Sequence, residues 1–203
     1  MALAVLIVVV LQLLLPDRHV VHPTYLFPIA ELGLLVALVI GDPGRIDKTS
    51  ALLRRLTMAL ILVMTLDNTL AVVELVVGVL SNKKSDTATV LLATGAAVWL
   101  TNVITFSLWF WELDRSGPAA RASGNSTAPA FAFPEMLSPD LVEGDWMPQY
   151  VDYSFLAFTN ATAFSPTDTM PLKAWAKLMM MAESAVSVVV GIMIISRALN
   201  ILN

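Results

Sequence analysis

Long apolar runs separated by short polar segments set the pattern of the chain. These runs cover residues 1–15, 25–40, 51–80, 87–111, 153–163 and 172–199. A helix needs about 20 predominantly apolar residues to cross the hydrocarbon core of a bilayer. Three of the runs reach this length, two near the N-terminus are shorter, and the run at 153–163 is too short to span. The pattern predicts an all-α, polytopic helical membrane protein with four to five spanning helices and one short additional helix.

Composition agrees with a multi-pass protein of the cell membrane. The 203 residues are 57% hydrophobic and 14% charged, with a mean hydropathy of +0.76. The chain has no cysteine, which excludes disulfides, thiolate metal sites and thiol nucleophiles. The net charge is −4 and no continuous basic stretch occurs, so we expect no nucleic-acid partner.

Carboxylates and amides interrupt the apolar runs. Asp67, Asn68 and Glu74 lie in the run at 51–80, and Glu183 lies in the run at 172–199. A carboxylate inside a membrane costs several kcal/mol unless it is paired, protonated or hydrated, so these residues are candidate functional sites. The alternative is a hydrogen-bonded packing face against polar residues of the next helix, namely Thr94, Asn102 or Thr105.

The C-terminal third contains a string with a recognisable order of residues. It reads Thr162-Ala-Phe-Ser-Pro-Thr-Asp168-Thr-Met-Pro171-Leu-Lys-Ala-Trp175-Ala-Lys177. This string resembles the pore module of tetrameric potassium channels, whose pattern is Thr-Thr-Val-Gly-Tyr-Gly-Asp-x-x-Pro followed by x-x-x-Trp-Gly-Lys/Arg. The resemblance implies an outer helix at 87–111, an extramembrane loop at 113–149, a pore-like re-entrant helix at 150–163, a polar loop at 164–170 and an inner helix at 171–199. Residues 82–203 would form this module, and residues 1–81 a set of N-terminal membrane helices.

The filter itself departs from the family. Ser165, Pro166 and Thr167 stand where the family has Gly-Tyr-Gly, and these glycines allow backbone carbonyls to replace the hydration shell of potassium. Proline fixes φ and has no N–H, so the ladder of carbonyls is not expected to form. The resemblance implies a filter-like segment of residues with a wider, less selective lining: Thr162, Ala163, Phe164, Ser165, Pro166, Thr167 and Asp168. It also implies a hinge at Gly191, which is equally suited to close helix contact.

Asp168 has a simpler role available. An N-cap residue followed by a proline in the first helical turn is a common start of a helix, so Asp168 and Pro171 are also expected to open the last helix. The chain resembles, in addition, a family of uncharacterised bacterial integral membrane proteins, through Tyr153-Ser-Phe155, Arg197-Ala-Leu-Asn200 and a basic loop at 45–55. This second resemblance implies no activity.

Basic residues and the channel resemblance give opposite orientations. With a full span at each long run, one side of the membrane holds most of the basic residues: Arg45, Lys48, Arg54, Arg55, Arg115, Arg121, Lys173 and Lys177. The positive-inside rule places this side in the cytoplasm, whereas channel homology places the pore loop outside. A re-entrant loop that enters from the cytoplasm satisfies both the charges and the hairpin shape, and orientation stays open at this point.

The leading hypothesis is an ion channel-like protein that conducts inorganic cations with low or unknown selectivity, as a homo-oligomer in the lipid bilayer, a homotetramer by resemblance. The alternatives are a non-conducting membrane scaffold or accessory subunit, and a proton-coupled transporter that uses Asp67, Glu74 and Glu183. We expect no enzyme activity and no cofactor, because no nucleophile–base pair or phosphate-binding loop occurs. No metal site is expected either, since His19 and His22 lack a third ligand nearby.

Overall fold

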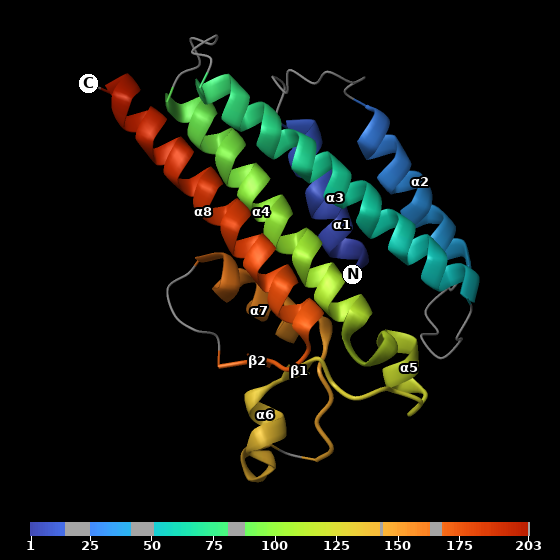
Figure 1. Ribbon diagram of the computed structural model, residues 1–203. Coiled ribbons are helices and arrows are strands. Elements are labelled where there is room, and N and C mark those ends of the chain that lie inside the picture. The colour runs from blue at the N-terminus through green and yellow to red at the C-terminus, as the bar shows by residue number, and fades with distance from the viewer. Residues whose placement is uncertain (15–24, 42–50, 81–87, 143, 163–167, 203) are drawn as a thin grey trace.

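The computed structural model describes residues 1–14, 25–41, 51–80, 88–142, 144–162 and 168–202 (Figure 1). Its elements follow the chain as α1 (Ala2–Leu14), α2 (Leu26–Gly41), α3 (Ala51–Leu80), α4 (Ala88–Leu113), η1 (Asp114–Ser116), α5 (Pro118–Ala122), β1 (Phe131–Ala132), α6 (Pro134–Leu137), η2 (Pro139–Leu141), α7 (Tyr150–Thr162), β2 (Met170–Pro171) and α8 (Ala174–Leu202). The predicted all-α class is confirmed, apart from the two short strands.

Three helices of the described chain are long and apolar enough to cross a membrane. The qualifying segments are Ala51–Gly78 in α3, Thr89–Ser116 from α4 into η1, and Ala174–Ser196 in α8. The apolar helices α1 and α2 have 13 and 16 residues. At 1.5 Å per residue they extend only about 20 and 24 Å, less than the ~30 Å of a hydrocarbon core. The structure therefore supports a membrane protein built on three long helices.

The helix α4 is the centre of the bundle. It contacts α1, α3, α7 and α8 (Figure 1). Its approach to α8 is close because Gly95 has no side chain: a Cβ there would lie 1.8 Å from Cδ1 of Ile194. Ala97 of the same helix is buried too, so small residues of α4 allow close helix contact.

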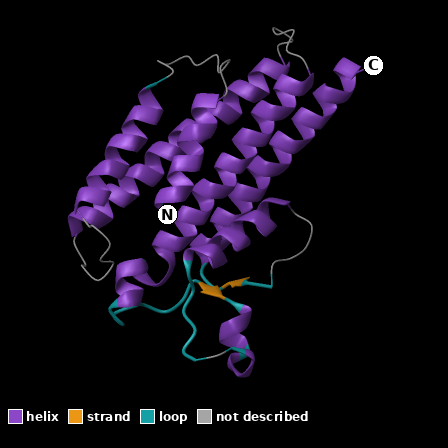
Figure 2. Cartoon of the chain, turned by 180° about the vertical axis from the view of Figure 1, so that it is seen from behind, coloured by secondary structure: helices purple, strands orange, loops and turns teal. Residues whose placement is uncertain are grey.

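The β strands, α5 and α6 gather at one end of the bundle, hereafter the β-strand end (Figure 2). The ends of α4 and the starts of α3, α7 and α8 also lie there (Figure 1). An aromatic core joins these elements, with ring centroids 5.2 Å apart for Phe110–Phe131 and for Phe133–Tyr153. Trp175, in the first turn of α8, packs edge-on against Phe131 at 6.0 Å. This core fixes the starts of α7 and α8 against the end of α4.

Two sequence-based expectations about this end are wrong. Pro171 does not open the last helix: it lies in β2, opposite Phe131 of β1, and α8 begins at Ala174. A strand at the edge of a two-stranded sheet tolerates a residue without an N–H, and the backbone N–H of Leu172 donates to the carbonyl of Ala130 at 2.8 Å. Asp168, which is exposed, is therefore not the N-cap of that helix.

The segment at 113–149 is also more ordered than a non-helical loop, since it contains η1, α5, β1, α6 and η2. Three aromatic residues, Trp109, Phe110 and Trp111, lie near the end of α4. Aromatic rings at the end of a membrane helix commonly lie at the water interface. Instead Phe110 is fully buried, and the indole N–H of Trp109 donates to Oγ1 of Thr65 at 2.9 Å. These rings bind α4 to its neighbours: Phe110 packs against Phe131 in the segment after α4, and Trp109 bonds to α3.

Candidate functional site

Polar side chains meet inside the bundle and link six helices. Asp67 and Asn68 are consecutive in α3, and both are buried. Asp67 contacts α1, whereas Asn68 contacts α4. The two residues thus connect a carboxylate cluster on one side of α3 to an amide cluster on the other.

The carboxylate cluster consists of Gln12, Glu31 and Asp67. The side-chain nitrogen Nε2 of Gln12 lies 3.1 Å from both carboxylate oxygens of Glu31 and 2.8 Å from Oδ2 of Asp67. All three side chains are buried. A single amide therefore lies within hydrogen-bonding distance of two carboxylates from different helices. Sequence reasoning singled out Asp67 but missed Gln12 and Glu31 as its neighbours.

The amide cluster consists of Asn68, Asn102 and Ser187. Nδ2 of Asn68 donates to Oδ1 of Asn102 at 3.1 Å. Nδ2 of Asn102 in turn donates to Oγ of Ser187 at 3.1 Å and to the backbone carbonyl of Glu183 at 3.3 Å. The cluster ties α3, α4 and α8 together and matches the predicted packing of α3 polar groups against Asn102.

The end of α7 is held to the second and third turns of α8 by four residues, here named the α7 clamp: Asn160, Met180, Glu183 and Ser184. Nδ2 of Asn160 donates to the carbonyl of Met180 at 2.9 Å and to Oε2 of Glu183 at 2.7 Å. In return, the hydroxyl of Ser184 donates to the carbonyl of Asn160 at 3.0 Å. Glu183 is fully buried, and its Oε1 has no hydrogen-bond partner among the described residues.

Replacing Asn102 by alanine is expected to lower the free energy of unfolding by about 1–2 kcal/mol, because contacts to both α3 and α8 are lost. Unfolding in detergent followed by tryptophan fluorescence would measure it. Thr69→Ala is the control, since the exposed Thr69 hydroxyl donates only to the carbonyl of Thr65 in its own helix. We expect the control to change stability by less than about 0.5 kcal/mol. Equal losses in the two variants would contradict a role for Asn102 between helices.

The structure brings together only part of the residues singled out from sequence. Asp67, Asn68 and Glu183 join the buried clusters, whereas Glu74 is half-buried and Asp168 is exposed. Thr162 ends α7, and its hydroxyl donates to the carbonyl of Thr159 at 3.0 Å. The other filter-like residues, Ala163, Phe164, Ser165, Pro166 and Thr167, lie outside the described residues, as do His19 and His22. A Cβ at the expected hinge Gly191 would meet no atom within 4 Å.

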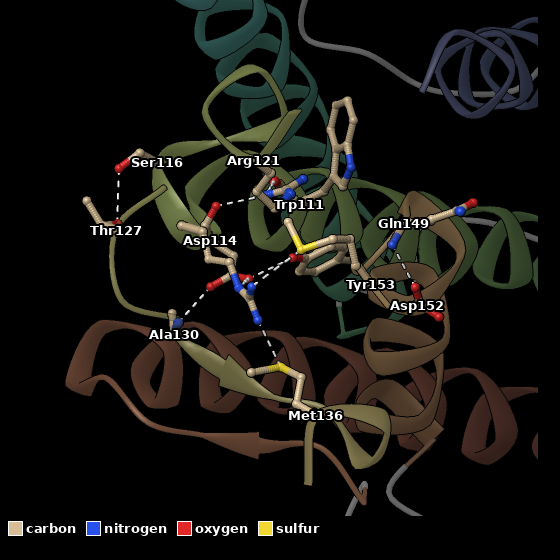
Figure 3. Close-up of polar contacts among 12 residues, drawn as sticks. Trp111, Asp114, Ser116, Arg121, Thr127, Ala130, Met136, Gln149, Asp152 and Tyr153 are labelled. Carbon is tan, nitrogen blue, oxygen red and sulfur yellow. Dashed lines mark hydrogen bonds and ion pairs between the residues drawn. The ribbon is translucent and has the colours of Figure 1, made fainter. Parts of the chain in front are cut away.

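Sequence reasoning missed a buried carboxylate that positions α7. Figure 3 shows Asp114 between β1 and α7: its Oδ1 accepts from the backbone N–H of Ala130 at 2.6 Å, and its Oδ2 accepts from the hydroxyl of Tyr153 at 2.7 Å. The Arg121 guanidinium donates through Nη1 to the carbonyls of Trp111 and Asp114, and it lies 5.3 Å from the centroid of the Tyr153 ring. We name Asp114, Arg121, Ala130 and Tyr153 the Asp114 cluster.

The chain reaches this arrangement through a tight reversal after α4. Arg115 and Ser116 have positive φ values of 51° and 68°, and Gly117 follows with φ of 95°. Left-handed backbone is costly for residues with a side chain, so surrounding contacts must hold this turn. Burial, with the adjacent Asp114 carboxylate, raises the pKa of the Tyr153 hydroxyl above its usual range. Tyr153 therefore stays a hydrogen-bond donor at physiological pH.

Comparisons with family models, curated proteins and solved structures give no match to this chain. The resemblance to potassium-channel pores therefore rests on the residues between Thr162 and Lys177.

Proposed function

We propose that the protein conducts inorganic cations through a pore built around α7 and α8, in a homo-oligomer of the cell membrane. The observation that carries this proposal is the α7 clamp, which holds the end of a short helix against the first half of the long apolar helix α8. In a pore of the potassium-channel type, the short helix likewise ends within the membrane, beside the inner helix.

The geometry of α7 supports a re-entrant segment. Its 13 residues extend about 20 Å, too short for a span. It starts at the β-strand end, and β2, which follows it in the chain, lies at that same end (Figure 1). The position of both elements at one end of the bundle supports a re-entrant path for the chain. With this re-entrant helix, α3, α4 and α8 would be full spans. The four to five spans expected would also require the shorter helices α1 and α2.

The chemistry at the end of α7 suits cations. The last carbonyls of a helix carry partial negative charge, and the Thr162 hydroxyl lies among them. In this proposal the hydroxyls of Ser165 and Thr167, with the carboxylate of Asp168, complete a lining that lacks the glycine carbonyl ladder. We expect this lining to discriminate only weakly between sodium and potassium, because no ladder of carbonyls replaces the hydration shell of the ion.

One hairpin cannot enclose a pathway, so the proposal requires several copies, four by resemblance. Exposed apolar side chains on α7 and α8 suit contact with lipid or with another copy: Val151, Phe155, Phe158, Leu178, Met181 and Ile192. Arg54 lies at the start of α3, Arg115 directly after α4 and Lys173 directly before α8. These helix ends gather at the β-strand end (Figure 1), so the positive-inside rule favours a pore-like segment that enters from the cytoplasm.

Flux of potassium, sodium and protons through the purified protein in liposomes tests the proposal. We expect sodium and potassium to pass at similar rates, and both Pro166→Gly and Thr162→Val to change the sodium-to-potassium ratio, by up to about tenfold, which corresponds to about 1.4 kcal/mol. Ser123→Ala, at an exposed position outside α7, is the control and should leave the ratio unchanged. Absence of flux in a well-folded oligomer would contradict conduction and favour a scaffold or accessory subunit.

A proton-coupled transporter is the second candidate, favoured by the carboxylate cluster, where Glu31 and Asp67 share one amide. Carboxylates inside membrane proteins frequently carry protons along a transport path. For a transporter, Asp67→Asn should abolish flux driven by a pH gradient while the oligomer stays intact, and Glu74→Gln should do the same. For the proposed channel, these changes should leave the sodium-to-potassium ratio unaltered.

A further inference from the structure

A large cavity opens at the β-strand end, away from the α7 clamp. Its volume is about 1150 Å³. Its walls are formed by the start of α1, by α2, α3 and the end of α4, and by residues 116–122 and 147–150. A drug-sized ligand or one lipid tail with its head group fits a volume of this order. The carboxylate cluster and the amide cluster contribute no residue to its lining, and the Asp114 cluster contributes Arg121 alone.

One wall of the cavity is apolar. It is formed by Leu35, Leu38 and Val39 of α2 and by Leu53 of α3. On α2 the neighbouring Val36 and Ile40 are exposed at 53% and 76%, so the apolar surface continues outward along the helix. An acyl chain could therefore lie on this wall without leaving an apolar environment.

Three charged side chains also line the cavity. Arg54 and Glu112 form an ion pair, with 3.8 Å between Nε and Oε1, and the Arg54 side chain remains 52% exposed. Arg121 supplies a second guanidinium. It is only 7% exposed, and its Nη2 has no hydrogen-bond partner among the described residues. Two positive groups face one negative group, which leaves net positive charge for an anion.

Two of these charged groups lie in the terminal turns of long apolar helices, which is the level of the lipid head groups when such helices cross a membrane. Arg54 lies in the first turn of α3, and Glu112 lies in the last turn of α4. Trp111 and Tyr150 also line the cavity and pack edge-on, with centroids 5.8 Å apart. Amphipathic rings of this kind favour the boundary between hydrocarbon and water. Arginines between membrane helices at this level are suited to lipid phosphates.

We propose that this cavity binds one anionic phospholipid of the surrounding leaflet. Its phosphate lies between Arg54 and Arg121, and one acyl chain lies along the wall of Leu35, Leu38 and Val39. Glu112 holds Arg54 at the cavity and disfavours a second anion.

Native mass spectrometry of the detergent-purified full chain, titrated with phosphatidylglycerol or phosphatidylcholine of equal chain length, tests this site. We expect one phosphatidylglycerol per chain to bind about tenfold more tightly than phosphatidylcholine. Arg54→Gln should remove this preference, and Arg55→Gln is the matched control, because Arg55 is exposed but does not line the cavity. Ala51→Trp, which adds a bulky ring at the cavity edge, should weaken both lipids.

Each remaining outcome overturns the proposal. Equal binding of the two lipids, or equal effects of Arg54→Gln and Arg55→Gln, would show general surface attraction in place of a site. Competition by glycerol 3-phosphate without acyl chains would assign the cavity to a soluble phosphate. The ion fluxes of these variants need not change, so this test is independent of the proposed conduction.

Discussion

Replacing Asp114 by alanine is expected to lower the free energy of unfolding by about 3–4 kcal/mol, the largest loss of any single change considered. Asp114 is fully buried, and its two oxygens accept from the N–H of Ala130 and from the hydroxyl of Tyr153. Removal leaves two buried donors without an acceptor and the nearby Arg115, whose Nε lies 3.7 Å from Oδ2, without its counter-charge. Breaking a buried charged network costs this much because the remaining groups cannot reach water.

Unfolding in detergent by increasing denaturant, followed by tryptophan fluorescence, would measure the loss. The control is Asp140→Ala, which removes an exposed carboxylate of the same segment and should cost less than about 0.5 kcal/mol. Asp114→Asn keeps one acceptor oxygen and should fall between the two. A loss for Asp114→Ala as small as that of the control would mean that the Asp114 cluster does not hold the start of α7.

Replacing Gly95 by leucine is expected to cost about 2–3 kcal/mol by forcing α4 and α8 apart. Even a Cβ would lie 1.8 Å from Cδ1 and 2.5 Å from Cγ1 of Ile194, and these atoms belong to a buried side chain. Overpacking of this kind shifts side chains and backbone. The contact lies beside Leu91, Val98 and Val190, so there is little room for Ile194 to move.

The same substitution at Gly191 is the matched control, because a Cβ there meets no atom within 4 Å. Leucine favours a helix over glycine, so Gly191→Leu should leave stability unchanged or raise it by up to about 1 kcal/mol. If Gly191 is a hinge, that variant alters ion flux without altering stability. The double variant Gly95→Leu/Ile194→Ala should lose less than the sum of the single losses, and strict additivity would argue against direct contact.

The long helices could be predicted well because each needs an apolar run of a length set by the thickness of the bilayer. The runs at 51–80 and 87–111 correspond closely to α3 and α4. The short run at 153–163 ends one residue after α7. The contact between Asn68 and Asn102 was among the expected alternatives, since polar groups in adjacent membrane helices seek each other. Periodicity and chain order were sufficient for these features.

The features that failed depend on contacts between distant residues. Pro171 suggested the start of a helix, but pairing with Phe131, forty positions earlier, places it in a strand. Asp114 looked like an ordinary polar residue at the end of a helix. Its burial follows from the reversal at Arg115–Gly117 and from the return of Tyr153, neither of which has a local signal apart from one glycine. Gln12 was missed because a single amide in an apolar run gives no indication of its partners.

The amide cluster has a consequence for the order of events during synthesis. Asn102 follows Asn68 by 34 positions and can meet it as soon as α3 and α4 are both in the membrane. Ser187 lies 85 positions further on, so at about 5–20 residues per second it emerges roughly 4 to 17 s later. During this interval the side-chain amide of Asn102 lacks both of its acceptors, because Glu183 and Ser187 have not yet been synthesised. The nascent hairpin therefore keeps the unpaired amide of Asn102 until α8 is inserted beside it. Insertion of α8 one helical turn too high or too low would leave this amide without its acceptors.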